Sequence, residues 1–202
     1  MNRILAKIGA IIVFVTVVLF AAFMLFSIDF GSYFVCIILS IGFIMMSAGF
    51  CNECREERKT AAYIGMIFAA IYATLISIVY FAQLTMVSFG TLNEQAMSIL
   101  DFKKGGLLFN YDLLGYGMMA LSTFFVGLTI DTKSKSDKWL KGLLIIHGVF
   151  FPACFVMPMT GMFSLIANES SAVGGIIALE CWCVYFMPIA ILSIIHFGKE
   201  SR

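Results

Sequence analysis

Long apolar runs separated by short polar segments dominate the pattern along this chain. A helix that crosses a bilayer needs about 20 mainly apolar residues, and six runs approach or exceed that length. They cover residues 8–26, 33–50, 61–81, 113–130, 140–159 and 172–197. Helices are expected because the lipid interior offers no hydrogen-bond partners to an open backbone. The pattern therefore predicts an all-α fold, in which residues 1–202 form a single polytopic membrane domain, a bundle of six transmembrane helices.

Composition supports this assignment and narrows the possible partners. The chain is 61% hydrophobic and 12% charged, whereas soluble domains carry about 25% charged residues. The net charge of +1 argues against a nucleic-acid partner. Arg3 and Lys7 precede the first run as they would in a signal peptide, but the run is longer than the usual signal core of about 7–15 residues. We therefore expect a retained first helix and contacts with membrane lipids.

Basic residues predict the orientation of the bundle. Of the 13 Lys and Arg residues, all but Lys103 and Lys104 fall in segments on one side of the predicted helices, together with both chain ends. Positively charged loops remain on the cytoplasmic side of a membrane. The distribution predicts that both termini lie in the cytoplasm and that the protein is a multi-pass plasma-membrane protein.

The segment between the third and fourth runs differs from the other connections. Residues 91–94 (Thr-Leu-Asn-Glu) have the form of a helix capping box. Apolar residues then follow at helical spacing, and Gly105 and Gly106 supply a stop. We expect a short amphipathic helix on the outer leaflet, which is either a surface tether or a lid over an outward-facing cavity.

Small residues recur every four positions along the third run. Gly65, Ala69 and Ala73 are central in this stripe, and small residues at this spacing let helix backbones approach closely. The stripe predicts a packing seam inside the bundle. A homodimer face is the alternative.

Ionisable residues within the last two runs are the first candidates for function. Charged groups inside a membrane are expensive and usually functional, and His147 and Glu180 lie at depths that differ by only about 6 Å at 1.5 Å per residue. The same two runs contain all three prolines of the chain, Pro152, Pro158 and Pro188, which tend to kink helices. We expect a ligand-binding or proton-linked cavity here. A structural hydrogen bond between His147 and Glu180 is the alternative.

Asp112 and Gln83 form a second, weaker candidate. Asp112 stands at the predicted start of the fourth helix, where the helix dipole favours a carboxylate. It could instead line the outer mouth of a cavity with Gln83.

The cysteines indicate neither a metal nor a cofactor. Cys51 and Cys54 make a single CxxC pair, and a zinc site needs two further ligands. We interpret them as juxtamembrane structural or lipidated thiols, with redox chemistry as the alternative. An enzyme is also the less favoured class, because no nucleophile and base stand at a recognisable spacing.

One segment resembles a known group of sequences. Asn110–Gly117 and the following Leu121-Ser122-Thr123 are similar to a stretch of uncharacterised six-helix membrane proteins of Gram-positive bacteria. The resemblance implies a bacterial plasma-membrane protein and implies no activity.

Two functions remain as hypotheses. The first is a membrane protein that binds or transports a small molecule or lipid through a cavity bounded by the predicted helices four to six. The second is a non-transporting structural or regulatory subunit, assembled with itself or with a partner membrane protein through the small-residue stripe.

Overall fold

The structure is a computed structural model that describes residues 1–160 and 170–199. For residues 170–178 it describes the backbone alone. Its described part is all-helical, and six helical segments are long and apolar enough to cross a membrane. They are α1 (Asn2–Leu25), α2 (Asp29–Glu53), α3 (Lys59–Ala82), α5 (Leu107–Thr129), the pair α6 (Lys135–His147) and α7 (Phe150–Met159), and α9 (Ser170–Gly198). The prediction of an all-α protein with six membrane-length helices is confirmed. The connection over residues 161–169 lies outside the described residues.

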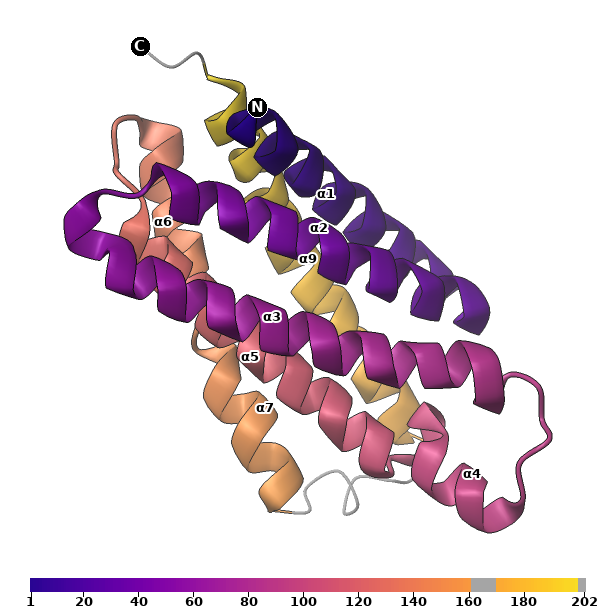
Figure 1. Cartoon of the computed structure of the whole chain (residues 1–202). Coiled ribbons are helices and arrows are strands. Elements are labelled where there is room, and N and C mark those ends of the chain that lie inside the picture. Colours follow the sequence, from indigo (N-terminus) through magenta and orange to yellow (C-terminus); the bar gives the residue numbers. More distant parts are fainter. Residues whose placement is uncertain (161–169, 200–202) are drawn as a thin grey trace.

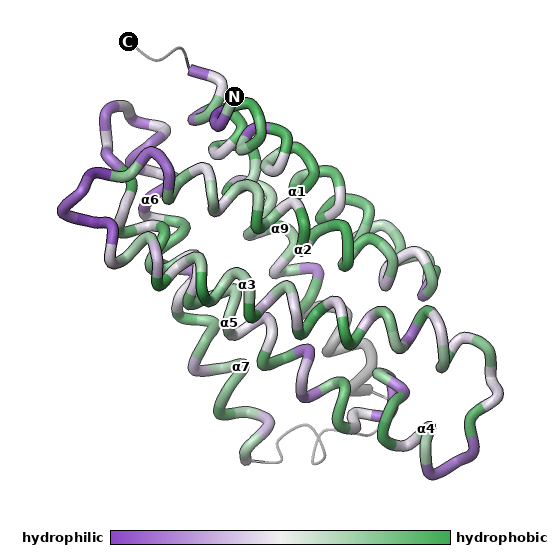
Figure 2. The backbone as a smooth tube through the Cα atoms, viewed as in Figure 1, coloured by the Kyte–Doolittle hydropathy of each residue, from purple (hydrophilic) through white to green (hydrophobic). Residues whose placement is uncertain are grey.

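The membrane-length helices close into a ring. α1 contacts α2, α2 contacts α3, and α3 contacts α5. α5 in turn contacts both α6 and α7. α9 closes the ring because it contacts both α6 and α1. The start of α1 and the end of α9 lie at one end of this bundle, together with the α2–α3 and α5–α6 connections (Figure 1). We call this the terminal end, and the opposite end, where α4 lies, the distal end. Hydrophilic residues gather in the connections, while the helices are mainly hydrophobic (Figure 2).

α5 begins six residues earlier than the hydropathy pattern predicts. The expected start was residue 113, but the helix begins at Leu107, and its first turn contains no acidic residue. Asp112 is therefore well inside the helix and almost completely buried. The interpretation of Asp112 as a first-turn residue favoured by the helix dipole is wrong.

The predicted fifth span is two helices. α6 ends at His147 and α7 begins at Phe150. Between them the amides of Gly148 and Val149 donate to carbonyls three residues back, at 3.1 and 3.0 Å. Pro152 occupies the third position of α7, where a helix has no intrahelical partner for an N–H group. The break therefore falls just before this proline.

The other two prolines lie inside continuous helices. Pro158 is within α7 and Pro188 is within α9. A proline cannot donate to the carbonyl four residues before it. α7 ends at Met159, the residue after Pro158, whereas α9 continues past Pro188 to Gly198.

The small-residue stripe on α3 is used within the chain. A Cβ added at Gly65 would meet Val126 Cγ2 of α5 at 3.0 Å. The Ser122 hydroxyl donates to the Gly65 carbonyl at 2.8 Å. Ala69 and Ala73 are also buried. These three residues of the stripe therefore lie inside the bundle of this chain, and a homodimer stays a prediction.

The distal segment contains the expected short helix, with a different cap. α4 (Glu94–Leu100) begins after Asn93, whose side chain accepts a hydrogen bond from the Ala96 amide at 2.9 Å. The predicted cap at Thr91 is therefore wrong by two residues. A π-helical turn, η2 (Gln83–Val87), extends α3 towards this segment, and a short 3₁₀ turn, η3 (Phe102–Lys104), follows α4. The place of α4 on a membrane surface stays a prediction.

Candidate functional site

A carboxyl group with one unpaired oxygen lies in the interior of the bundle. Asp112 is only 3% exposed, and its Oδ1 has no hydrogen-bond partner among the described residues. Its position on α5 directs it towards residues of α2 and α3. Buried polar side chains normally have partners, so this oxygen requires an explanation.

Polar side chains from three helices surround Asp112. The Tyr80 hydroxyl of α3 lies beside both the Asp112 carboxyl and the thiol of Cys36 on α2. The Cys36 sulfur lies 3.8 Å from the hydroxyl oxygen of Tyr116, which is on α5. The Tyr72 ring of α3 meets the Tyr116 ring edge-on, with centroids 5.8 Å apart. We call these five residues the Asp112 cluster.

The Asp112 cluster contains a second unpaired atom. Tyr72 is fully buried, and its hydroxyl oxygen has no hydrogen-bond partner among the described residues. Asp112 and Cys36 both lie near enough to act electrostatically on this hydroxyl. Two unpaired polar atoms therefore share one neighbourhood.

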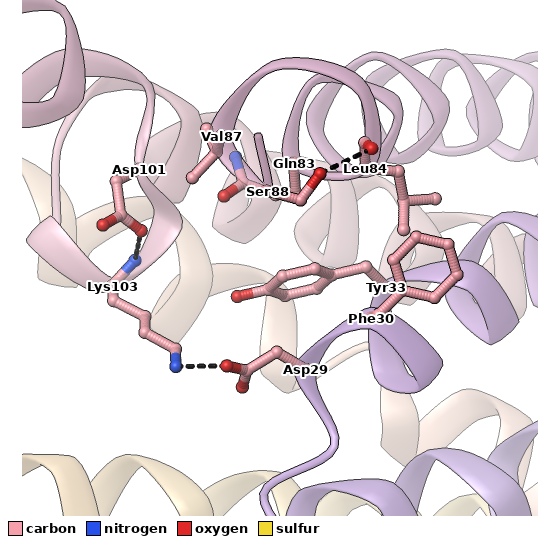
Figure 3. A pocket seen from close by; sticks show the side chains of 9 residues that line it. All are labelled: Asp29, Phe30, Tyr33, Gln83, Leu84, Val87, Ser88, Asp101 and Lys103. Atoms are coloured by element: carbon pink, nitrogen blue, oxygen red, sulfur yellow. Dashed lines mark hydrogen bonds and ion pairs between the residues drawn. The ribbon is translucent and has the colours of Figure 1, made fainter. Parts of the chain in front are cut away.

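A pocket of about 330 Å³ opens at the distal end above the Asp112 cluster. Figure 3 shows the side chains that line it, which come from α2, η2 and the segment around η3. Tyr33 of α2 lines the pocket and stacks on Tyr80 with ring centroids 5.5 Å apart. The Tyr33–Tyr80 stack thus joins the pocket to the Asp112 cluster.

The charges of this distal pocket are mainly acidic. Asp29 and Asp101 line it, and Lys103 is its one cationic lining residue. The Lys103 ammonium forms an ion pair with Asp29, and the Lys103 amide donates to Asp101 at 2.9 Å (Figure 3). Lys103 is therefore already engaged by a carboxylate of the same pocket.

Gln83 is a clamp for the distal segment. Its side-chain amide donates to the Leu100 carbonyl at 2.7 Å and accepts from the Phe102 amide at 3.1 Å. Both ends of the side chain are thereby used to hold the α4–η3 segment on the end of α3. Gln83 also lines the pocket, but it does not reach Asp112 with either bond.

His147 has two partners, and neither of them is Glu180. The indole N–H of Trp182 donates to His147 Nε2 at 3.0 Å. Nδ1 lies 2.7 Å from the Thr123 hydroxyl, which also donates to the Ala120 carbonyl at 2.9 Å. Because the indole is only a donor, Nε2 carries no proton. These partners assign a neutral ring whose Nδ1–H donates to Thr123.

Glu180 is separate from this network. It is partly buried, and its Oε1 has no hydrogen-bond partner among the described residues. The hypothesised His147–Glu180 pair is therefore not formed in this structure. Neither His147 nor Glu180 lines the pockets described here at the two ends of the molecule.

An ion-pair network closes the terminal end. His196 of α9 stands between Asp137 at 2.9 Å and Glu53 at 3.2 Å. Arg3 pairs with Glu53 at 2.9 Å, and Lys199 pairs with Asp137 at 2.8 Å. The network links α1, α2, α6 and the end of α9 around a pocket of about 650 Å³.

A second ion-pair group fixes the neighbouring connections. Arg55 and Arg58 approach the Asp131 carboxylate at 2.7 and 3.0 Å. Burial alone would raise the pKa of Asp131, but the hydrogen bond from Arg55 and the two guanidinium charges hold that pKa below its usual value.

The CxxC pair lacks the surroundings of a reactive thiol. Cys51 donates to the Ala62 carbonyl at 3.1 Å, and burial raises the pKa of Cys54. Redox-active thiols instead have a lowered pKa. Among the residues that the structure describes, no group of three His, Cys, Asp or Glu side chains is placed to hold a metal ion.

Sequence reasoning named Asp112 and missed the residues around it. Tyr72, Tyr80 and Tyr116 stand in or beside apolar runs, where a tyrosine is counted as hydrophobic although it brings a hydroxyl into the core. Trp182 was missed as the partner of His147 for the same reason. Helical spacing offered a signal, since Tyr72 and Tyr80 are two turns apart and Asp112 and Tyr116 are one turn apart.

No family model, curated protein or solved structure matches this chain. The resemblance of Asn110–Gly117 to uncharacterised six-helix membrane proteins stays a prediction.

Proposed function

We propose that this protein is a multi-pass plasma-membrane transporter that binds a small molecule at the Asp112 cluster and passes it between the two ends of the bundle. The observation that carries the proposal is the buried, unpaired oxygen of Asp112. An ionisable residue inside a membrane-spanning bundle is a functional candidate by default, because its burial is expensive.

The unpaired atoms support binding over a purely structural role. Leaving a buried polar group without a partner costs about 1–3 kcal/mol. Asp112 and Tyr72 both carry this cost within one cluster. A ligand that forms hydrogen bonds with both atoms would remove this energetic cost.

The position of the cluster supports passage through the bundle. Pockets lie at the distal and terminal ends, and between them Tyr72, Phe43 and Phe186 are fully buried. Phe43 contacts both of the other rings, with centroids 5.3 Å from Tyr72 and 6.4 Å from Phe186. This aromatic group closes the interior, so transport requires these rings to separate. The cavity of this proposal is bounded by α2, α3 and α5, in place of the predicted helices four to six.

Charge supports an orientation with both termini in the cytoplasm. Lys103 and Lys104 belong to η3 at the distal end, whereas the ion pairs of the terminal end contain Arg3, Arg55, Arg58 and Lys199. A green fluorescent protein fused after residue 202 should fluoresce in whole cells, and an alkaline phosphatase fused there should be inactive. Active phosphatase at this position would reverse the proposed orientation.

Cys36 allows a direct test of access to the cluster. In a variant that keeps Cys36 and replaces the other five cysteines by Ala, the impermeant thiol reagent MTSET, applied from the distal side, should modify Cys36. The control keeps only Cys54, which is also buried but lies at the terminal end, directly after α2. If Cys36 is as unreactive as Cys54, the bundle does not open to the Asp112 cluster and the proposal fails.

A further inference from the structure

We propose that the ligand of the Asp112 cluster is a small organic ammonium cation, which exchanges with the proton of the Asp112 carboxyl. This inference rests on the proposed function and specifies its substrate class.

The Asp112 cluster contains one acidic side chain and no basic one. Asp112 is its one carboxyl, and its other members carry hydroxyl or thiol groups. None of the five is Lys, Arg or His, and His147 belongs to a network that holds it neutral. An ionised Asp112 therefore lacks a cationic partner within the cluster. A cationic ligand would supply that partner, whereas an anion would add a second negative charge.

Aromatic rings surround Asp112 and also line the approach to it from the distal pocket. Tyr72, Tyr80 and Tyr116 surround the carboxyl, and Tyr33 and Phe102 stand on the approach to it, with centroids 5.5 and 6.2 Å from Tyr80. Ammonium groups bind favourably over the faces of such rings, especially when desolvated. Calcium and magnesium instead require about six or more oxygen ligands, often several carboxylates. One carboxyl amid aromatic rings fits an organic cation better than it fits these metals.

The distal pocket, through which a ligand would approach Asp112, is lined by more acidic than basic residues and so favours a cation. Asp29 and Asp101 line the pocket, and both act electrostatically on the Tyr33 hydroxyl together with Asp112. The single lining cation, Lys103, is paired with Asp29. A pocket of this sign raises the local concentration of cations, and the Tyr33–Tyr80 stack is the last barrier before the carboxyl.

The exchange conserves charge inside the bundle. With the site empty, Asp112 is a neutral acid, because an isolated carboxylate in apolar surroundings is strongly disfavoured. When the ammonium cation enters, the O–H bond of Asp112 breaks, the proton leaves to water through the distal pocket, and the carboxylate pairs with the cation. One positive charge replaces another, and the net charge of the occupied site stays at zero.

The test compares charged and uncharged ligands of one shape. Full-length protein in detergent and weak buffer is titrated with choline chloride, butylammonium chloride, the neutral choline analogue 3,3-dimethyl-1-butanol, or sodium chloride at equal ionic strength. We expect at least one ammonium compound to raise the melting temperature and release up to one proton per protein. The neutral analogue and sodium chloride should do neither.

Matched variants assign the effect to one carboxyl. Asp112→Asn should abolish proton release and weaken ammonium binding on the order of a hundredfold, the loss expected when one partner of a buried charge pair is removed. Glu180→Gln, which changes a partly buried carboxyl with one unpaired oxygen outside the cluster, should leave both readouts unchanged. The melting temperature of each empty variant verifies that it is folded.

The outcomes separate this inference from the proposed function. If neither ammonium compound binds, if sodium chloride alone reproduces the effect, or if Asp112→Asn retains proton release, the inference is wrong. If the neutral analogue binds as well as choline in an Asp112-dependent way, the ligand class is wrong while the proposed function stands. Unreactive Cys36 in the labelling experiment would remove the proposed function itself.

Discussion

His147 and Asp112 are both ionisable, both almost fully buried, and both attached to helices that contact one another. They differ in their partners. Each ring nitrogen of His147 has one, and the hydroxyl that serves Nδ1 is itself satisfied by the Ala120 carbonyl. Asp112 has an oxygen without any partner among the described residues, next to a tyrosine hydroxyl in the same condition.

This difference separates a structural group from a functional one. A fully satisfied buried network rigidifies a core, whereas a partly satisfied one is costly until something else completes it. Burial and charge alone do not distinguish the two residues, and in the sequence His147 was the stronger candidate. The deciding property is whether each polar atom has a partner, which only the three-dimensional arrangement reveals.

The largest effect that tests this comparison is expected at His147. Replacement by Ala removes a buried ring and leaves the Trp182 N–H without an acceptor, so the free energy of unfolding should fall by about 3–5 kcal/mol. Unfolding in mixed micelles with increasing dodecyl sulfate measures the change. His147→Gln, which keeps an acceptor and a donor, should recover part of the loss. A loss below about 1 kcal/mol for His147→Ala would show that the satisfied network does not stabilise the fold.

A much smaller effect is expected at Asp112 in the absence of ligand. Asp112→Asn keeps the shape of the side chain and gives up no hydrogen bond at Oδ1, so the free energy of unfolding should change by no more than about 1 kcal/mol. The same dodecyl sulfate titration provides the measurement. If Asp112→Asn lowers the free energy of unfolding as much as His147→Ala does, Asp112 is a structural residue like His147.

The smallest effect is expected at Asp131, a carboxylate with two arginine partners at the terminal end. Asp131→Asn should lower the free energy of unfolding by about 0.5 kcal/mol at pH 7, because exposed ion pairs contribute little. Since the pKa of Asp131 is lowered in the folded state, its contribution is complete above the pKa of the unfolded chain. It is lost as pH falls through the folded pKa.

A comparison of wild type and Asp131→Asn at pH 7 and at the lowest pH that the fold survives tests this sign. The gap between them should narrow in acid. A gap that widens there would contradict it.

Hydropathy predicted the membrane helices but not their ends. The six spans follow from the run lengths alone, because a bilayer imposes that length on any crossing helix. The start of α5 was placed too late because Asn110, Tyr111 and Asp112 interrupt the apolar run. The helix nevertheless continues through them from Leu107, since helical backbone bonds are satisfied whatever the side chains are.

The candidate site was only partly predictable for a related reason. Asp112 was visible as a charge near an apolar run, but the tyrosines around it were counted among the apolar residues. The three prolines predicted irregular backbone in both of the last two spans. The fifth span breaks at Gly148 and Val149, just before Pro152, whereas α9 continues through Pro188. Gln83 was visible as a polar residue, while its clamp on Leu100 and Phe102 depends on a fold of the distal segment that no periodicity encodes.

The closure of the ring by α9 has a consequence for how the protein is made. Arg3, near the first residue of the chain, donates to the carbonyl of His196, near the last, and a Cβ on Gly49 would collide with both Ala6 and Phe197. Chains are synthesised from the N-terminus, so α1 is made long before α9, one of the two helices that it contacts most. Until α9 arrives, His147 also lacks the indole of Trp182. A chain that lacks this helix would therefore leave the α9-facing surfaces of α1 and α2 uncovered and the His147 imidazole without its indole donor.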